Sequence, residues 1–140
     1  MKCIKRILLP VFAMLFSLLV LPGCSAKPYS FEEPIDTIEY IKIVTAESSL
    51  KFSVLKTLSE NEKHDFLEQF QDIPFYTYYL GDPMSVYGTA AMICYSSGNY
   101  EMVSYSWSEY VKDGQIYFIR KSCEEEVFHS LLDQYFMQPL

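Results

Sequence analysis

The chain has few of the groups that enzymes and nucleic-acid-binding proteins use. Its 140 residues include two histidines, five glycines and 11 basic side chains against 18 acidic ones. The sequence contains no Gly-x-Ser-x-Gly elbow, no glycine-rich phosphate loop and no Asp-x-Asp-x-Asp-Gly calcium loop. An acidic balance disfavours contact with a phosphate backbone. The sequence therefore predicts no cofactor, no metal site and no nucleic-acid partner.

Long apolar runs are also missing, except at the N-terminus. Residues 7–21 form one such run after a basic start that contains Lys2, Lys5 and Arg6, which is the arrangement of a secretory signal peptide. These 15 residues form roughly 22 Å of helix, which is shorter than the roughly 30 Å hydrocarbon core of a bilayer. We expect a cleaved signal peptide, and an uncleaved membrane anchor is the alternative.

The apolar run ends in Leu21-Pro22-Gly23-Cys24. This tetrapeptide resembles the lipobox of bacterial lipoproteins, although Pro22 stands where a small residue other than proline is usual. The resemblance implies diacylglycerol transfer to the Cys24 sulfur and cleavage before it, which makes residues 1–23 a lipoprotein signal peptide. The protein would then be held by palmitate-type acyl chains at the extracytoplasmic face of the cell membrane. The rival processing event is cleavage by ordinary signal peptidase after Ala26.

The mature chain is strongly acidic. Without residues 1–23 it has 117 residues, with 8 basic against 18 acidic side chains and a net charge of −10. That length is enough for one domain with a core, and the charge repels anionic headgroups. Membrane attachment must then come from the lipid alone. Residues 24–34, with two prolines, predict a tether, and residues 35–140 predict a single domain.

Hydrophobic periodicity predicts the architecture of this domain. We expect an α+β fold, with an antiparallel sheet of about six strands and two helices packed on one face, in the order β-β-α-β-β-β-β-α. Capping boxes that start at Ser59 and Ser122 predict the two helix starts, and Pro74 ends the first helix. Strand patterns cover residues 35–44, 50–57, 75–80, 89–95 and 100–107, and flank Asp113-Gly114.

The turn positions predict which side chains share a face of the sheet. A two-residue turn at Ser97-Gly98 would pair Met92 with Val103. The face covered by the helices would then carry Met92, Val103, Tyr105, Trp107, Val111, Ile116 and Phe118. The opposite face would carry Ile93, Tyr95, Tyr100, Met102, Ser104, Ser106, Tyr110 and Tyr117.

Tyrosine is the abundant residue with functional potential. All 12 tyrosines follow the signal peptide, and tyrosine offers a rigid contact area with a polar tip. We expect a binding or accessory module, of immunity or inhibitor type in one version, which is not an enzyme and contacts a protein or cell-wall ligand. The candidate ligand contacts are Tyr95, Tyr100, Tyr110, Tyr117, Asp82 and Tyr87. The plainer explanation is that these tyrosines only cover the sheet.

Two alternatives to a binding role stay open. One is a small envelope hydrolase that uses His64 or carboxylates, since Glu60, His64 and Glu68 share a helix face by their spacing. The other is a purely structural envelope protein.

Cys94 and Cys123 either form a disulfide or remain as two buried thiols, and no local motif supports a nucleophilic cysteine.

The whole layout also resembles a known class of protein. A lipobox, a short tether and one compact α+β domain, with the stretches YYLGDP, YSSGNYEM and SCEEEVFHSLL, resemble the small lipoproteins of uncharacterised function that are common in Gram-positive bacteria. The resemblance covers most of the chain. It implies a surface-tethered accessory or binding role and supplies no catalytic residues.

Overall fold

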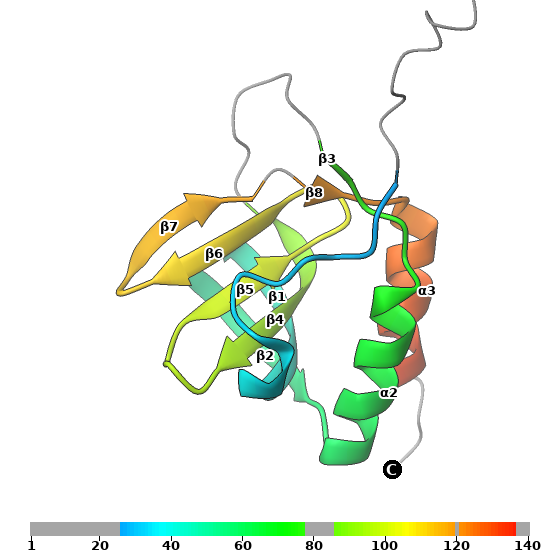
Figure 1. The fold of residues 1–140 in the computed structure, drawn as a ribbon, viewed down its shortest axis with the longest axis horizontal. Coiled ribbons are helices and arrows are strands. Elements are labelled where there is room, and N and C mark those ends of the chain that lie inside the picture. The colour runs from blue at the N-terminus through cyan, green and yellow to red at the C-terminus, as the bar shows by residue number, and fades with distance from the viewer. Residues whose placement is uncertain (1–25, 78–85, 120, 137–140) are drawn as a thin grey trace, which may run out of the picture.

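The computed structural model describes residues 26–77, 86–119 and 121–136. Within these ranges the chain forms an antiparallel six-stranded sheet, a two-stranded sheet and two helices (Figure 1). The predicted α+β class and element order are confirmed. The strand predicted over residues 75–80 includes the two-residue β3, which pairs with the added two-residue strand β8 in the small sheet. The elements are η1 (Ile35–Thr37), β1 (Ile38–Ser48), β2 (Lys51–Thr57), α2 (Glu60–Gln71), β3 (Tyr76–Thr77), β4 (Gly88–Tyr95), β5 (Tyr100–Val103), β6 (Ser108–Lys112), β7 (Gln115–Phe118), β8 (Lys121–Ser122) and α3 (Glu125–Phe136).

The two helices lie side by side against one face of the large sheet (Figure 1). The strands of that sheet follow the order β2-β1-β4-β5-β6-β7. Helix α2 buries Phe66 and Phe70, and α3 buries Phe128 and Leu132, in one cluster with Ile43 of β1. The expectation that both helices cover the same face is confirmed.

Local sequence explains the start of one helix and misplaces the start of the other. At α2 the capping box is present, with Ser59 N donating to Glu62 Oε2 at 2.8 Å and Glu62 N donating to Ser59 Oγ at 3.4 Å. The second predicted box is wrong, because Ser122 pairs with Tyr76 in the small β3–β8 sheet. Helix α3 begins three residues later, at Glu125. Strand pairing therefore overrides the capping pattern at this position.

The β4–β5 hairpin corrects the predicted register. Gly98 adopts a φ of 88°, Gly98 N donates to Tyr95 O, and Tyr95 N donates to Asn99 O, both at 3.0 Å. These bonds enclose a three-residue loop with a left-handed glycine, where a two-residue turn was expected. Met92 consequently faces Met102, and Ala91 faces Val103. A shift of one residue transfers every side chain of a strand to the other face.

The face predicted for the helices is therefore wrong at five positions. Val103 and Tyr105 do pack in or against the helix-side cluster. Met92 and Trp107 belong to a second cluster on the far face. The far face also holds Val111, Ile116 and Phe118. Residues that pair across neighbouring strands have their side chains on the same face of the sheet, and the pairing of these three leads back to residues of the second cluster. The β6–β7 turn is as expected, with positive φ at both Asp113 and Gly114.

The early end of β5 also contributes to the wrong assignment of side chains to the two faces. The pattern over residues 100–107 predicts one strand, but β5 ends at Val103. Ser104 N donates to Trp107 O at 2.8 Å, which closes a tight turn before β6. A serine-rich stretch can form this turn because the Ser104 hydroxyl also accepts from Trp107 N at 3.2 Å.

The far face of the sheet is curled. Phe52 on β2 lies 6.2 Å from Tyr100 on β5, between ring centroids, although three strand spacings of a flat sheet span roughly 14 Å. Tyr100 Oη also donates to Ser49 O, in the β1–β2 turn, at 2.7 Å. The curvature encloses the second cluster, which contains Val44, Ala46, Val86, Ala90, Met92, Met102 and Trp107.

Candidate functional site

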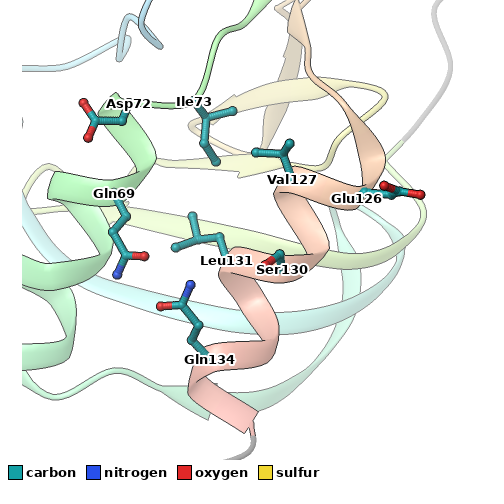
Figure 2. Close-up of a pocket in the computed structure, with 8 residues that line it drawn as sticks. All are labelled: Gln69, Asp72, Ile73, Glu126, Val127, Ser130, Leu131 and Gln134. Carbon is teal, nitrogen blue, oxygen red and sulfur yellow. The ribbon is translucent and has the colours of Figure 1, made fainter.

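A cleft of about 630 Å³ lies between the end of α2 and the outer side of α3 (Figure 2). Antiparallel packing of the helices places the last turn of α2 beside the first turns of α3. The side chains of both helices therefore converge on one space. The eight lining residues are Gln69, Asp72, Ile73, Glu126, Val127, Ser130, Leu131 and Gln134.

Amide and aliphatic side chains form the inside of the cleft. Figure 2 shows Gln69 and Gln134 extending from facing helices toward the space between them. Ile73, Val127 and Leu131 provide an aliphatic wall, in which Val127 is 39% exposed and the other two are buried. Each carboxamide has two N–H donors and one oxygen acceptor. The cleft can therefore pair with an amide group while it packs against small apolar groups.

The charged side chains lie at the rim. Asp72 and Glu126 point away from the central space on opposite sides in Figure 2. No lysine or arginine lines the cleft within the described ranges. Binding inside it must therefore rely on hydrogen bonds and apolar contact, and an anionic ligand is disfavoured at the entrance.

A second hollow of about 400 Å³ adjoins the cleft along α3. It is lined by Glu126, His129, Ser130, Asp133 and Gln134. His129 Nε2 lies 3.7 Å from Glu125 Oε1, and the imidazole packs 5.6 Å from the Tyr105 ring. His129 is therefore held at the border of the core, as an ordinary i, i+4 partner of a glutamate.

Glu101 is a buried carboxylate inside the domain. Its side chain accepts from Tyr29 Oη at 2.5 Å, from Glu32 N at 2.5 Å and from Tyr95 Oη. Burial raises the pKa of Glu101, and the hydrogen bonds that it accepts oppose this rise. Burial also raises the pKa of Tyr29, reinforced by the charge of Glu101. A buried, perturbed carboxylate is a catalytic candidate in general, but here its partners are the segment before β1 and the sheet.

Glu109 is a second buried carboxylate, on the far face of the sheet. Its Oε2 accepts from the buried Ser49 hydroxyl. Within the described ranges, Glu109 Oε1 and the indole nitrogen of Trp107 have no hydrogen-bond partner. These two atoms are an acceptor and a donor at the margin of the second cluster. A buried polar atom without a partner costs stability.

The tyrosines predicted as ligand contacts do not share one surface: Tyr95, Tyr110 and Tyr117 are neighbours, and the other two lie elsewhere. Tyr95 is 2% exposed in the helix-side cluster, and Tyr110 beside it donates to Glu33 Oε1 at 2.7 Å. Tyr117 lies 6.3 Å from Tyr110, between ring centroids, and is 49% exposed. Tyr100 packs on the opposite face. Tyr87 is exposed just before β4. The expected single tyrosine-rich face is therefore wrong.

The other predicted positions are also separate. Cys94 and Cys123 are both free thiols, and they pack in clusters on opposite faces of the sheet, so the disulfide alternative is wrong. Burial raises the pKa of both thiols, to about 12 for Cys123. His64 is exposed on α2 and lines neither hollow. Cys24 and Asp82 lie outside the described residues.

The described ranges contain neither a metal-binding cluster nor a membrane-spanning helix. In the part of the chain that the structure describes, no three metal-ligating side chains converge. Neither of the two helices there is long and apolar enough to cross a bilayer. Comparison of the chain with protein-family models, curated proteins and solved structures found no match. The chemistry of the cleft is thus the observation from which a function can be argued.

Sequence reasoning missed the cleft residues. Gln69 and Gln134 are two of many polar residues on a pair of amphipathic helices. The polar positions can be read from helical periodicity, but nothing in the sequence says which of them face each other. That depends on the antiparallel packing of α2 and α3.

Proposed function

We propose that this protein is a lipid-anchored binding module at the extracytoplasmic face of the cell membrane, and that its ligand occupies the cleft between α2 and α3. The observation that carries the proposal is the lining: two facing carboxamides, Gln69 and Gln134, beside an aliphatic wall. The signal sequence and the lipobox-like segment that ends at Cys24 support the location.

The ligand that best fits this lining contains amide groups next to methyl groups. Both a peptide and an N-acetylated glycan of the cell wall have this chemistry. A carboxamide can donate to a ligand carbonyl and accept from a ligand N–H at the same time. Methyl groups pack against Val127 and the buried aliphatic side chains behind it, which removes apolar area from water. The acidic rim selects neutral or cationic ligands.

Binding is a better proposal than catalysis for this surface. A general base must lie within hydrogen-bond reach of the proton that it removes, and a nucleophile must lie beside the base. Ser130 and His129 are neighbours in α3, but adjacent helical residues do not face each other. The partner of His129 is Glu125, with 3.7 Å between His129 Nε2 and Glu125 Oε1. The exposed His64 lies outside both hollows.

A titration followed by NMR tests the proposal. The two probes are a blocked tetra-alanine peptide and tri-N-acetylchitotriose, which separate a peptide source from a glycan source of the same amide chemistry. We expect one probe to shift the side-chain amide signals of Gln69 and Gln134 and the methyl signals of Val127. The double variant Gln69→Leu, Gln134→Leu should bind about tenfold more weakly, because each lost hydrogen bond contributes about 0.5 to 1.5 kcal/mol.

The matched control for this titration is Gln71→Leu. Gln71 is the last residue of α2, is exposed and does not line the cleft, so this variant should bind like the parent. Equal weakening by Gln71→Leu would assign the effect to general helix damage. Shifts that avoid the cleft with both probes would contradict the proposed site.

A further inference from the structure

The segment before β1 is packed on the domain for most of its length. The sequence predicts a tether over residues 24–34, but Lys27 and Phe75 form an antiparallel bridge. Lys27 N donates to Phe75 O, and Phe75 N donates to Lys27 O, both at 2.9 Å. Figure 1 shows this segment entering beside β3 and crossing the sheet to η1. We call residues 27–33 the strap.

Buried contacts hold the strap in place. Tyr29 is 4% exposed and packs within 5.2 Å, between ring centroids, of Phe31, Phe70 and Phe75. Its hydroxyl donates to the buried carboxylate of Glu101 at 2.5 Å. These contacts combine apolar burial with a charge-assisted hydrogen bond. The strap is therefore part of the folded domain.

Charged and aromatic contacts add to this at both ends of the strap. Lys121 Nζ lies over the Tyr29 ring, 4.3 Å from its centroid, and donates to Ser30 O. At the other end, Glu33 Oε1 accepts from Ser97 Oγ at 2.7 Å and from Asn99 Nδ2 at 2.8 Å. Separate elements thus fix both ends of the strap.

The remaining free length is very short. Two residues lie between Cys24 and Lys27. An extended chain spans at most about 3.6 Å per residue step, so over these three steps the two Cα atoms lie within about 11 Å of each other. The acyl chains on Cys24 would place its sulfur at the headgroup level of the bilayer. The Lys27 end of the domain therefore cannot move further than that length from the acylated residue.

We infer that the end of the domain formed by Lys27, β3 and β8 is held directly against the surface of the lipid bilayer. This inference rests on the proposed acylation of Cys24. Covalent reach sets the distance of this end from the bilayer, so that distance should not depend on ionic strength, unlike attachment through charge. The acidic domain gains no attraction to anionic lipid from its own surface.

The orientation also places the proposed cleft near the membrane. Ile73 lines the cleft and lies two residues before Phe75, the bridge partner of Lys27. Figure 1 shows the end of α2 and the start of α3 at the same end of the domain as β3 and β8. The opposite end of α2, at Glu60, is about 17 Å further along the helix axis. Ligands of the cleft would therefore be met close to the bilayer surface.

Fluorescence quenching in vesicles tests the inference. The acylated full-length protein is labelled at Thr77→Cys, on β3, or at Asn61→Cys, at the far end of α2; both positions are exposed. Cys94 and Cys123 label slowly because burial raises the pKa of both thiols. The vesicles contain phosphatidylcholine and a nitroxide-headgroup lipid. We expect several-fold stronger quenching at position 77 than at position 61, unchanged by added salt.

A lengthened tether provides the matched control. Insertion of a Gly-Ser linker of about 12 residues after Ala26 adds a root-mean-square reach of about 19 Å, which should reduce quenching at position 77 to the level at position 61. Equal quenching at the two positions with the native tether would overturn the inference. The mass of the N-terminal peptide is measured on the same samples. An acylated Cys24 with equal quenching refutes the orientation alone, whereas an unacylated Cys24 refutes the lipid anchor on which both proposals rest.

Discussion

Replacement of Glu101 by alanine should destabilise the domain by about 3 kcal/mol. The side chain is fully buried, and it accepts hydrogen bonds from Tyr29, Tyr95 and the backbone of Glu32. Removal of the carboxylate leaves three donors without an acceptor in a region that water reaches poorly. Each stranded donor costs roughly 1 to 3 kcal/mol, partly offset by the desolvation of the carboxylate that is no longer required.

Urea denaturation followed by circular dichroism measures this loss. Glu101→Gln is the matched control, because its amide keeps the shape and one acceptor oxygen. We expect Glu101→Gln to lose less stability than Glu101→Ala. A Glu101→Ala protein as stable as the parent would contradict the role of Glu101 as the buried acceptor that holds the strap.

The difference in stability between the parent and Glu101→Gln should depend on pH, and its direction follows from the pKa of Glu101. Burial raises the pKa of Glu101 above its ordinary value of 4.5, so the folded state binds this proton more tightly than the unfolded chain. The stabilising contribution of the proton is complete below the unfolded pKa and is lost as pH rises through the folded pKa. The stability of the parent relative to Glu101→Gln should therefore increase as pH falls from 7 toward 4.5.

Other carboxyl groups have pKa values that shift in the opposite direction, and their contribution to the pH dependence of stability must be subtracted. A hydrogen bond from Lys56 lowers the pKa of Glu62 to about 2, so the stability that this group contributes falls as pH drops below its ordinary range. Hydrogen bonds from Asn99, Tyr110 and Ser97 outweigh partial burial and lower the pKa of Glu33. Both groups are present in the parent and in Glu101→Gln, so they cancel in the difference. A difference that decreases toward pH 4.5 would contradict the buried state of Glu101.

Replacement of Phe70 by alanine should cost about 3 to 5 kcal/mol. The ring is fully buried and lies at the centre of an aromatic cluster. Its centroid is 5.1 Å from that of Tyr29, 5.4 Å from Phe66 and 5.3 Å from Phe75. Alanine leaves a cavity that the rigid neighbouring rings fill poorly. Since domains are stable by only about 5 to 15 kcal/mol, this variant should melt far below the parent.

Phe118→Ala is the control for the Phe70 variant. Phe118 is 48% exposed on the edge strand β7, so the same chemical change should cost less than about 1 kcal/mol. Thermal unfolding of the three proteins gives the comparison. Equal losses for the two variants would contradict the position of Phe70 at the junction of α2, the strap and the segment before β3.

Local patterns were sufficient to predict the class and order of the fold. Ser59 and Glu62 form the predicted capping box, and Asp113-Gly114 forms the predicted two-residue turn. These features depend on a few adjacent residues, so they can be read without knowledge of distant contacts. The alternation of β-branched and polar side chains likewise depends only on neighbours.

The sequence could not show which side chains of the sheet lie under the helices, because one extra loop residue decides the register. Ser97-Gly98 fits both a two-residue turn and the three-residue loop that the structure contains. The left-handed Gly98 satisfies either choice locally. The choice is made by burial: the observed register places Ile93 and Tyr95 under the helices. That is a long-range preference, which a single hairpin sequence does not express.

The candidate site could be predicted only in part for a similar reason. The sequence indicates the exposed margins of α2 and α3, but the cleft arises from the way in which Gln69 and Gln134 are brought face to face. The sequence predicts a free tether over residues 24–34, because the prolines and polar residues there lack periodicity. Burial of Tyr29 against Phe70 and Glu101 depends on partners more than 40 positions away in the sequence.

The lipid anchor is the premise on which the location, the orientation and the membrane-proximal cleft depend. Metabolic labelling with an alkyne analogue of palmitate, followed by mass spectrometry of the N-terminal peptide, tests it directly. We predict an acylated mature chain that begins at Cys24, and complete loss of both label and membrane attachment in Cys24→Ala. An unlabelled chain that begins at Lys27, released in soluble form from the parent sequence, would contradict it.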